Sequence, residues 1–238
     1  MPLAQARASI QNRIVASLPS KQYIEFLSNL QPVSLRLNQV IYEAGEPIRH
    51  VYFPTGAMIS LVATREGGSR TVEVGVIGEE GMLGTTAFLG NPVALNKALV
   101  QLAGSALRVR LKVLQDAVEG GGLLHGLLHG YTQVVLVQIT RSAICNRFHS
   151  LKQRLARWLL VTHDNARSDS FPMTQEFLSS LLGSRRTDVS KVANALQKQG
   201  LVSYHRGSLT VINRKELEVA SCPCYKIVRG EIDRLHQR

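Results

Sequence analysis

The chain has 238 residues, of which 45% are hydrophobic, and its formal net charge is +11. A chain of this length can hold one large or two modest domains, each with a real hydrophobic core. No apolar run reaches the roughly 18 residues of a membrane span, and the first residues lack the apolar core of a signal peptide, so we expect a cytoplasmic protein with no membrane partner.

The positive charge is concentrated in the C-terminal part of the chain. Residues 1–140 contain 11 Lys/Arg and 9 Asp/Glu, a net charge of +2, whereas residues 141–238 contain 17 Lys/Arg and 8 Asp/Glu, a net charge of +9. A basic segment joined to a nearly neutral one is typical of a polyanion-binding domain with a separate partner domain. A generally basic surface is the alternative explanation.

The N-terminal half predicts short helices followed by many short strands. Residues 10–30 carry the apolar spacing of one or two helices. From Pro32 the chain is rich in Val, Ile and Tyr and is interrupted every few residues by Gly, Pro or Asn, which favours a β-sandwich or barrel. We expect a hairpin tip at residues 66–69 and further strands over residues 98–111. Helical character returns near Lys112.

A long helix is predicted over residues 123–149. Apolar or small residues recur at spacings of three and four, as follows: Leu124, Leu127 or Leu128, Tyr131, Val134 or Val135, Gln138, Ser142, Cys145 and Phe148. Residues 134–137 are all apolar, so this helix is expected to be buried on more than one side. One side would pack on the β domain and the other would pair with a second copy of the chain. A plain core helix is the alternative.

The C-terminal part predicts a winged helix. A helix over residues 151–164 and a polar loop over residues 165–172 precede two short amphipathic helices, over residues 174–198, that turn at Gly183. The second of these has an apolar back and a basic, hydrogen-bonding front, as a helix in a DNA major groove requires. Residues 201–212 alternate around Arg206 and Gly207, which predicts a β-hairpin. The remaining residues, 214–238, are again helical and charged.

These elements resemble the Crp/Fnr superfamily of bacterial transcription regulators over about residues 20–215. Residues 45–61 (GEPIRHVYFPTGAMISL) are similar to the start of the family's β-roll, residues 151–160 (LKQRLARWLL) to the first helix of its DNA-binding domain, and residues 173–202 to its winged helix-turn-helix. The resemblance implies an α+β fold with a β-roll of the double-stranded β-helix or jelly-roll type. We expect a sensor domain at residues 1–122, a dimerisation helix at 123–149, a winged helix at 150–220 and a tail at 221–238.

The resemblance implies a homodimer that binds double-stranded DNA, with RNA polymerase as a further candidate partner. No Ser/His/Asp triad, catalytic carboxylate pair or phosphate-binding loop of the Walker type is recognisable, so we expect no enzyme activity. By resemblance, bases would be read by Arg186, Thr187 and Lys191, and Ser190 lies on the same exposed stripe and is a further base-reading candidate. From their positions in the predicted elements, Thr174, Gln175, Arg185 and Arg206 are expected to contact phosphate. Ser184 is the expected N-cap of the recognition helix. Arg186 is the best single candidate for a guanine contact, and the alternative is that Arg186 contacts only phosphate. The alternative for Arg206 is a solvated turn that does not contact DNA.

The sensor domain departs from the cyclic-AMP-binding members of the family. Those members carry a Glu for the ribose and an Arg and Ser for the cyclic phosphate, whereas Thr85 and Asn96 stand at the Glu and Arg positions here. Without the bidentate Arg a phosphate loses its strongest partner, so we expect no dependence on cyclic AMP. The candidate effector pocket comprises Glu80, Thr85, Thr86, Asn96 and Lys97, although a solvated loop is the favoured interpretation of Glu79 and Glu80.

The sequence predicts no metal site and no cofactor. No cysteine precedes Cys145, which excludes the N-terminal iron–sulfur site of some family members. His125 and His129 are four residues apart but have no evident third ligand. Cys222 and Cys224 are separated by a single residue, with no second ligand pair visible, so oxidant or metal sensing is the less favoured interpretation. Cys145 is expected to be a buried small residue.

Three alternatives to a cyclic-AMP-independent DNA reader stay open. The chain could be a ligand sensor whose output is a protein contact, a regulator that responds to a cyclic nucleotide, or a regulator controlled by its abundance alone. The basic face of Arg186, Ser190 and Lys191 argues against the first. The effector, the operator sequence and the sign of regulation are not encoded in any recognisable motif.

Overall fold

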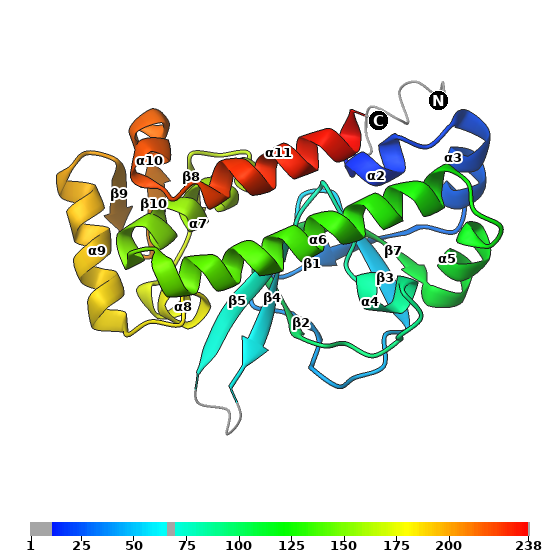
Figure 1. Cartoon of the computed structure of the whole chain (residues 1–238), viewed down its shortest axis with the longest axis horizontal. Helices are drawn as coiled ribbons and strands as arrows, with labels where there is room; N and C mark the ends of the chain where they lie inside the picture. Colours follow the sequence, from blue (N-terminus) through cyan, green and yellow to red (C-terminus); the bar gives the residue numbers. More distant parts are fainter. Residues whose placement is uncertain (1–10, 66–69, 238) are drawn as a thin grey trace. The chain divides into compact units, whose positions relative to one another are not determined.

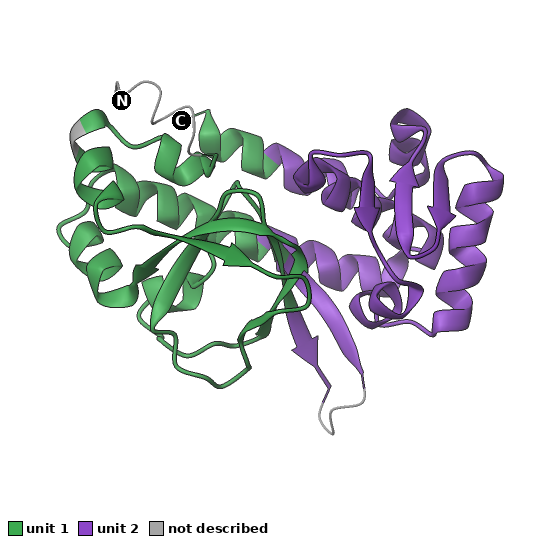
Figure 2. Cartoon of the chain, turned by 180° about the vertical axis from the view of Figure 1, so that it is seen from behind, with its two compact units in different colours: residues 1–61, 76–136, 231–238 green, residues 62–75, 137–230 purple. Residues whose placement is uncertain are grey.

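The computed structural model describes residues 11–65 and 70–237, so the hairpin tip expected at residues 66–69 lies outside the described residues. The chain forms two compact units (Figure 2), the first of residues 1–61, 76–136 and 231–238 and the second of residues 62–75 and 137–230. The predicted domains follow one another along the chain, whereas each of these units is assembled from separate segments. Among the described residues, no helix is both long and apolar enough to span a bilayer.

The first unit begins with two short helices, α2 (Arg13–Ala16) and α3 (Ser20–Leu27), as predicted. Asn12 fixes the start of α2, since its side-chain oxygen accepts a hydrogen bond from the Val15 amide at 3.2 Å. Its amide nitrogen donates to the carbonyl oxygens of Pro54 at 3.0 Å and Gly81 at 2.8 Å. A fully buried Asn must satisfy such donors, and it thereby ties the helix to two loops of the β domain.

Short antiparallel strands make up the β domain, which confirms the predicted fold class (Figure 1). One sheet has the order β1-β7-β3, built from β1 (Gln31–Leu35), β7 (Gly104–Arg110) and β3 (His50–Pro54). The other has the order β2-β6-β4-β5, built from β2 (Val40–Tyr42), β6 (Lys97–Leu102), β4 (Met58–Thr64) and β5 (Thr71–Ile77). Alternate residues of β3 and β7, such as Val51, Phe53 and Val109, point into one core.

The helices α4 (Thr85–Phe88), α5 (Leu111–Val118) and α6 (Leu123–Phe148) follow in the chain. The predicted inward face of α6 is confirmed, because its members are buried from Leu124 to Cys145. The exception is Phe148, which was expected inside and is 75% exposed. Phe148 is the last residue of α6, and at a helix end the spacing rule no longer guarantees a neighbouring element.

The second unit contains the winged helix. The elements in this part of the chain are α7 (Leu151–Ala166), β8 (Ser170–Pro172), α8 (Gln175–Leu181), α9 (Arg186–Lys198), β9 (Val202–His205), β10 (Ser208–Val211), α10 (Arg214–Ala220) and α11 (Cys224–His236), of which α11 continues into the first unit from residue 231. The segment predicted as a polar loop contains the strand β8, which pairs with β10 in the order β8-β10-β9. Three residues are too short to show a strand period in the sequence.

A glycine inside α11 predicts a simple gain in stability. A Cβ atom at Gly230 would have no other heavy atom within 4 Å, and a glycine in a helix interior costs about 1 kcal/mol relative to alanine. We therefore expect Gly230→Ala to raise the free energy of unfolding by about 1 kcal/mol, measured by urea denaturation at fixed protein concentration. Gly104→Ala is the contrasting variant, because its Cβ would lie 2.4 Å from the backbone of Gly56; equal effects would refute the packing argument.

Candidate nucleic-acid interface

The helix-turn-helix is stabilised by a buried apolar face, a helix cap at Thr174 and a tight turn at Gly183. Leu178 and Leu181 of α8 are buried, as are Val189, Ala193 and Leu196 of α9. The Thr174 hydroxyl caps α8 by accepting a hydrogen bond from the Phe177 amide at 3.2 Å. Gly183 adopts a φ of +59°, a conformation that glycine adopts without steric cost. The tight turn predicted at Gly183 is thus confirmed.

The start of α9 differs from the prediction. Arg185, not Ser184, occupies the N-cap position, and its side chain makes no capping hydrogen bond. Ser184 instead donates its hydroxyl proton to the carbonyl oxygen of Leu182 at 3.2 Å, within the turn. Ser184 has the preferred cap chemistry, but the left-handed turn at Gly183 delays the helix by one residue.

Three of the four predicted base-reading side chains lie exposed on α9. These are Arg186, Thr187 and Lys191. The Arg186 guanidinium lies 3.6 Å from the Glu176 carboxylate, but the two side chains are 67% and 80% exposed, so the pair contributes little stability. Lys191 lies 4.0 Å from Asp188, also at the surface. Both cations can therefore exchange these partners for a nucleic acid at small cost.

The fourth, Ser190, is half-buried and is engaged within the domain. Its hydroxyl hydrogen-bonds the side-chain oxygen of Gln175 and the carbonyl oxygen of Arg186. Gln175 was predicted to contact phosphate and Ser190 to read bases, and the structure brings the two side chains together. Because Gln175 accepts through its oxygen, its amide NH₂ group is directed away from Ser190 and stays a donor.

The predicted wing is present as the hairpin of β9 and β10. Arg206 and Gly207 form its two-residue turn, with φ values of 47° and 79°, as in the type I′ turns that match strand twist. The Gly207 carbonyl oxygen accepts a hydrogen bond from the Met173 amide at 2.7 Å, which fixes the wing to the segment before α8. The exposed Arg206 side chain is thus held at the tip by a rigid turn.

One substitution at the wing tip is expected to lower DNA affinity without lowering the stability of the fold. Left-handed backbone costs an ordinary residue roughly 1–2 kcal/mol, whereas Asn tolerates it. We expect Arg206→Asn to unfold at an equal or higher temperature and yet to bind duplex DNA several-fold more weakly, with a salt slope shallower by about one charge. Arg206→Lys is the charge-preserving control. Unchanged affinity in Arg206→Asn would show that the side chain is only solvated.

Four of the five residues expected to form an effector pocket, Glu80, Thr85, Thr86 and Lys97, have partners within the protein. The Thr85 and Thr86 hydroxyls donate to the carbonyl oxygens of Met82 at 3.3 Å and Val93 at 3.2 Å. The Lys97 ammonium group lies 3.0 Å from the Glu43 carboxylate, and Asn96 is half-buried. A ligand phosphate would have to displace Glu43 to use Lys97.

Glu80 corrects the favoured interpretation of a solvated loop. Its carboxylate accepts a hydrogen bond from the Gly78 amide at 2.8 Å, and burial raises the pKa of this carboxyl group above its usual range. Its charge acts on the buried Tyr131 of α6 and raises the pKa of that phenol further, beyond the effect of burial. Glu80 is therefore part of the packing beneath α6.

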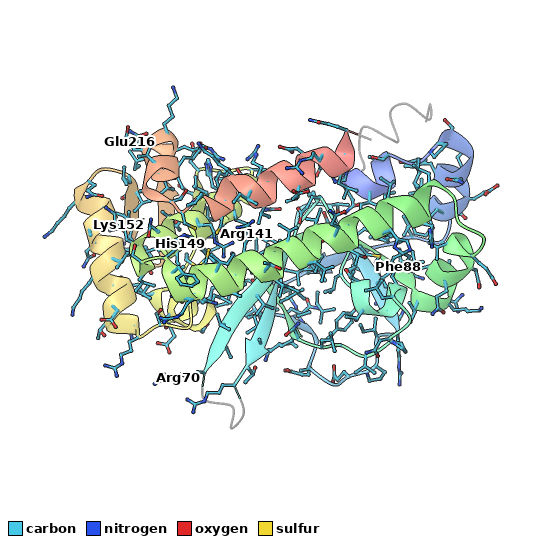
Figure 3. All side chains as sticks on the ribbon, in the orientation of Figure 1. Arg70, Phe88, Arg141, His149, Lys152 and Glu216 are labelled. Carbon is cyan, nitrogen blue, oxygen red and sulfur yellow. The ribbon has the colours of Figure 1, made fainter. Side chains whose placement is uncertain are left out.

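The two histidines of α6 form an aromatic group. The rings of His125 and His129 lie 4.4 Å apart, and both contact Phe88 edge to face at centroid distances of 5.8 and 5.2 Å. Phe88 is labelled in Figure 3. This packing accounts for their spacing without a metal. The cysteines of the chain, by contrast, are brought together within the second unit.

One face of α6 is mostly apolar, and its two largest side chains are exposed. Its members recur at spacings of four and three, and they are Thr132, Leu136, Ile139 and Ala143; we refer to these four residues as the α6 stripe. Leu136 is 60% exposed and Ile139 is 39% exposed. Spacings of four and three are those of a helix that pairs with another helix.

Comparisons with known proteins match this geometry. The family described as the Crp-like helix-turn-helix domain matches residues 153–220. FixK2 from Bradyrhizobium japonicum is 18% identical, with a TM-score of 0.68 over 81% of this chain and 98% of that chain. A putative transcriptional regulator of the crp/fnr family from Eubacterium rectale is 15% identical, with a TM-score of 0.66 over 92% and 97%.

A third solved structure has the same fold. The c-di-GMP responsive global regulator CLP from Xanthomonas campestris is 16% identical, with a TM-score of 0.63 over 81% of this chain and 99% of that chain. No curated protein matches the sequence. At these identities the structural similarity establishes the fold of the chain. The family match over residues 153–220 identifies this segment as a Crp-like helix-turn-helix domain.

Proposed function

We propose that the chain is a DNA-binding transcription regulator of the Crp/Fnr type, and that it acts as a homodimer that reads a nearly palindromic DNA site without cyclic AMP. The Crp-like helix-turn-helix match over residues 153–220 and the shared fold support this proposal. Such a regulator would work in the cytoplasm with RNA polymerase as a second partner. The observation that carries the proposal is the exposed face of α9, where Arg186, Thr187 and Lys191 have no strong partner. Their donors and acceptors suit base edges in a major groove.

The phosphate contacts would come from the residues around this face. Thr174 and Gln175 lie at the N-terminal end of α8, where backbone amides point outward and favour an anion. Arg185 precedes α9, and Arg206 lies at the wing tip. Contacts of this kind set the register of the protein on the duplex but carry no sequence information themselves.

The homodimer is supported by the α6 stripe. A leucine with most of its surface in water in the middle of a 26-residue helix loses the stabilisation that burial would supply. A second copy of α6 would cover this leucine and its neighbour Ile139. Two recognition helices related by a two-fold axis would then enter successive major grooves about 34 Å apart.

Independence from cyclic AMP is supported by the sensor domain. The position that would hold the cyclic phosphate with an Arg is Asn96 in this chain, and the nearby Lys97 is paired with Glu43. A neutral amide cannot supply the bidentate, charged fork of Arg. The proposed state that binds DNA is therefore the one without nucleotide.

Selection from a random duplex pool tests this proposal. The full chain is incubated with the pool at fixed salt, with and without cyclic AMP, and the bound duplexes are sequenced. We expect one palindromic sequence to be enriched equally in both samples. Enrichment that requires cyclic AMP would refute the nucleotide-free state, and salt-sensitive binding with no enriched sequence would refute sequence reading.

A further inference from the structure

Four potential metal ligands converge at the base of the winged helix. Cys145 lies near the end of α6, and His149 lies between α6 and α7. Cys222 lies between α10 and α11, and Cys224 is the first residue of α11. Figure 3 labels His149 at this junction. The three thiol sulfurs and a ring nitrogen of His149 all lie within 4.8 Å of one another. Three separate segments of the chain thus supply one cluster.

The spacing of these atoms matches the ligands of a single tetrahedral ion. A zinc–sulfur bond of about 2.3 Å places two ligand sulfurs roughly 3.8 Å apart. The sulfurs of Cys145 and Cys222 are 3.5 Å apart, and Cys224 Sγ is 3.9 Å from His149 Nδ1. A disulfide would instead require about 2.05 Å between sulfurs. An iron–sulfur cluster lies between its ligands and needs them farther apart than one ion does.

The cluster is largely enclosed and has a cationic neighbour. All three cysteines are buried, while His149 is half-buried. The positive charge of Arg157 acts on each of the three sulfurs, and the Arg157 Nε atom is buried without a hydrogen-bond partner in the described residues. A metal is bound by the thiolate form of cysteine.

We propose that Cys145, His149, Cys222 and Cys224 bind one structural Zn²⁺ ion. Three thiolates and a neutral imidazole around Zn²⁺ carry a net charge of −1, which Arg157 balances. Four protein ligands close the coordination sphere, as in structural rather than catalytic zinc sites. No metal is predicted from the sequence, because Cys222 and Cys224 have no second ligand pair nearby in the chain. The fold supplies that pair as Cys145, which is 77 positions from Cys222, and His149, which is 75 positions from Cys224.

The ion would fasten the two ends of the DNA-binding domain to each other. Cys145 and His149 precede α7, and Cys222 and Cys224 follow α10, so all of α7 to α10 lies between the ligands. A link between such distant residues constrains the unfolded chain strongly. Zinc would therefore stabilise the domain without contacting DNA, and loss of zinc can be distinguished from loss of the proposed DNA reading.

Metal analysis of the full chain tests the site. The protein is purified under reducing conditions, passed over a size-exclusion column with a weak chelator, and analysed by inductively coupled plasma mass spectrometry. We expect about one zinc per chain, as for a closed four-ligand site. Replacement by Co²⁺ should give the intense charge-transfer absorption of cobalt–thiolate bonds and the visible bands of a tetrahedral ion. Zinc content near zero together with no cobalt–thiolate absorption would overturn the proposal.

Matched variants locate the site. His149→Ala and Cys222→Ser should each lose most of the zinc, whereas His129→Ala, which changes another histidine near α6, should retain it. If the ligand variants fail to fold by circular dichroism, the cobalt spectrum of the unmodified chain decides alone. A stable disulfide between Cys145 and Cys222 in protein purified under reducing conditions, detected by intact mass, would also overturn the proposal.

Discussion

Arg186→Ala is expected to lower the affinity for the selected palindrome by at least about 30-fold, because a bidentate contact to guanine is worth about 1–3 kcal/mol and the dimer makes one such contact in each half-site. The side chain is 67% exposed and its ion pair with Glu176 is a surface pair, so the free energy of unfolding should change little. The preference at one base position of each half-site should also relax. Fluorescence anisotropy with duplexes that vary at each position, at constant salt, measures both effects.

Arg185→Ala is the matched control, since the neighbouring residue is also exposed and cationic but is expected to contact phosphate. It should weaken binding to all duplexes by a similar factor and reduce the salt slope by about one. If Arg186→Ala behaves in the same way, with no change in base preference, then Arg186 contacts only phosphate, and base reading lies elsewhere on α9.

Leu136→Glu is expected to separate the chain into monomers and to lower DNA affinity more than 100-fold, because two half-sites then bind independently instead of as one unit. The substitution would bury a carboxylate in the proposed interface, where an unpaired charge is costly. Sedimentation velocity reports the oligomeric state, and anisotropy on the same samples reports the affinity.

Val219→Glu controls for the general effect of a new surface carboxylate. Val219 lies on α10 and is 79% exposed, compared with 60% for Leu136, but it is not part of the α6 stripe. It should leave both the oligomeric state and the affinity close to those of the unmodified chain. A Leu136→Glu protein that remains dimeric would place the dimer contact on another surface.

Patterns local in the chain predicted most of the fold. The apolar spacing of α6, α7 and α9 gave helices whose buried faces the structure confirms, because a 3.6-residue period is a strong signal over several turns. The turn at Gly183 and the hairpin around Arg206 were recognisable for the same reason, since each depends on the conformational preferences of one or two residues. The apolar residues of α9 predicted which face of this helix is buried and therefore also which face is exposed.

The features that the sequence did not predict depend on neighbours distant in the chain or on single-residue shifts. The bond between Ser190 and Gln175 and the burial of Glu80 arise from tertiary packing. The N-cap at Arg185 depends on how the preceding turn is completed. The cluster of Cys145 with Cys222 spans 77 positions, and no spacing rule for metal ligands covers such a separation. Phe148 is exposed although it fits the apolar spacing of α6, because it is the last residue of that helix.

A comparison of the affinities for two duplexes tests most directly whether a two-fold dimer reads two half-sites together. The selected palindrome is compared with the same duplex after one half-site has been scrambled, using the unmodified chain without nucleotide at constant salt. The account predicts that scrambling one half-site lowers the affinity at least 100-fold. Equal affinity for the two duplexes would contradict it, because each chain would then read DNA alone.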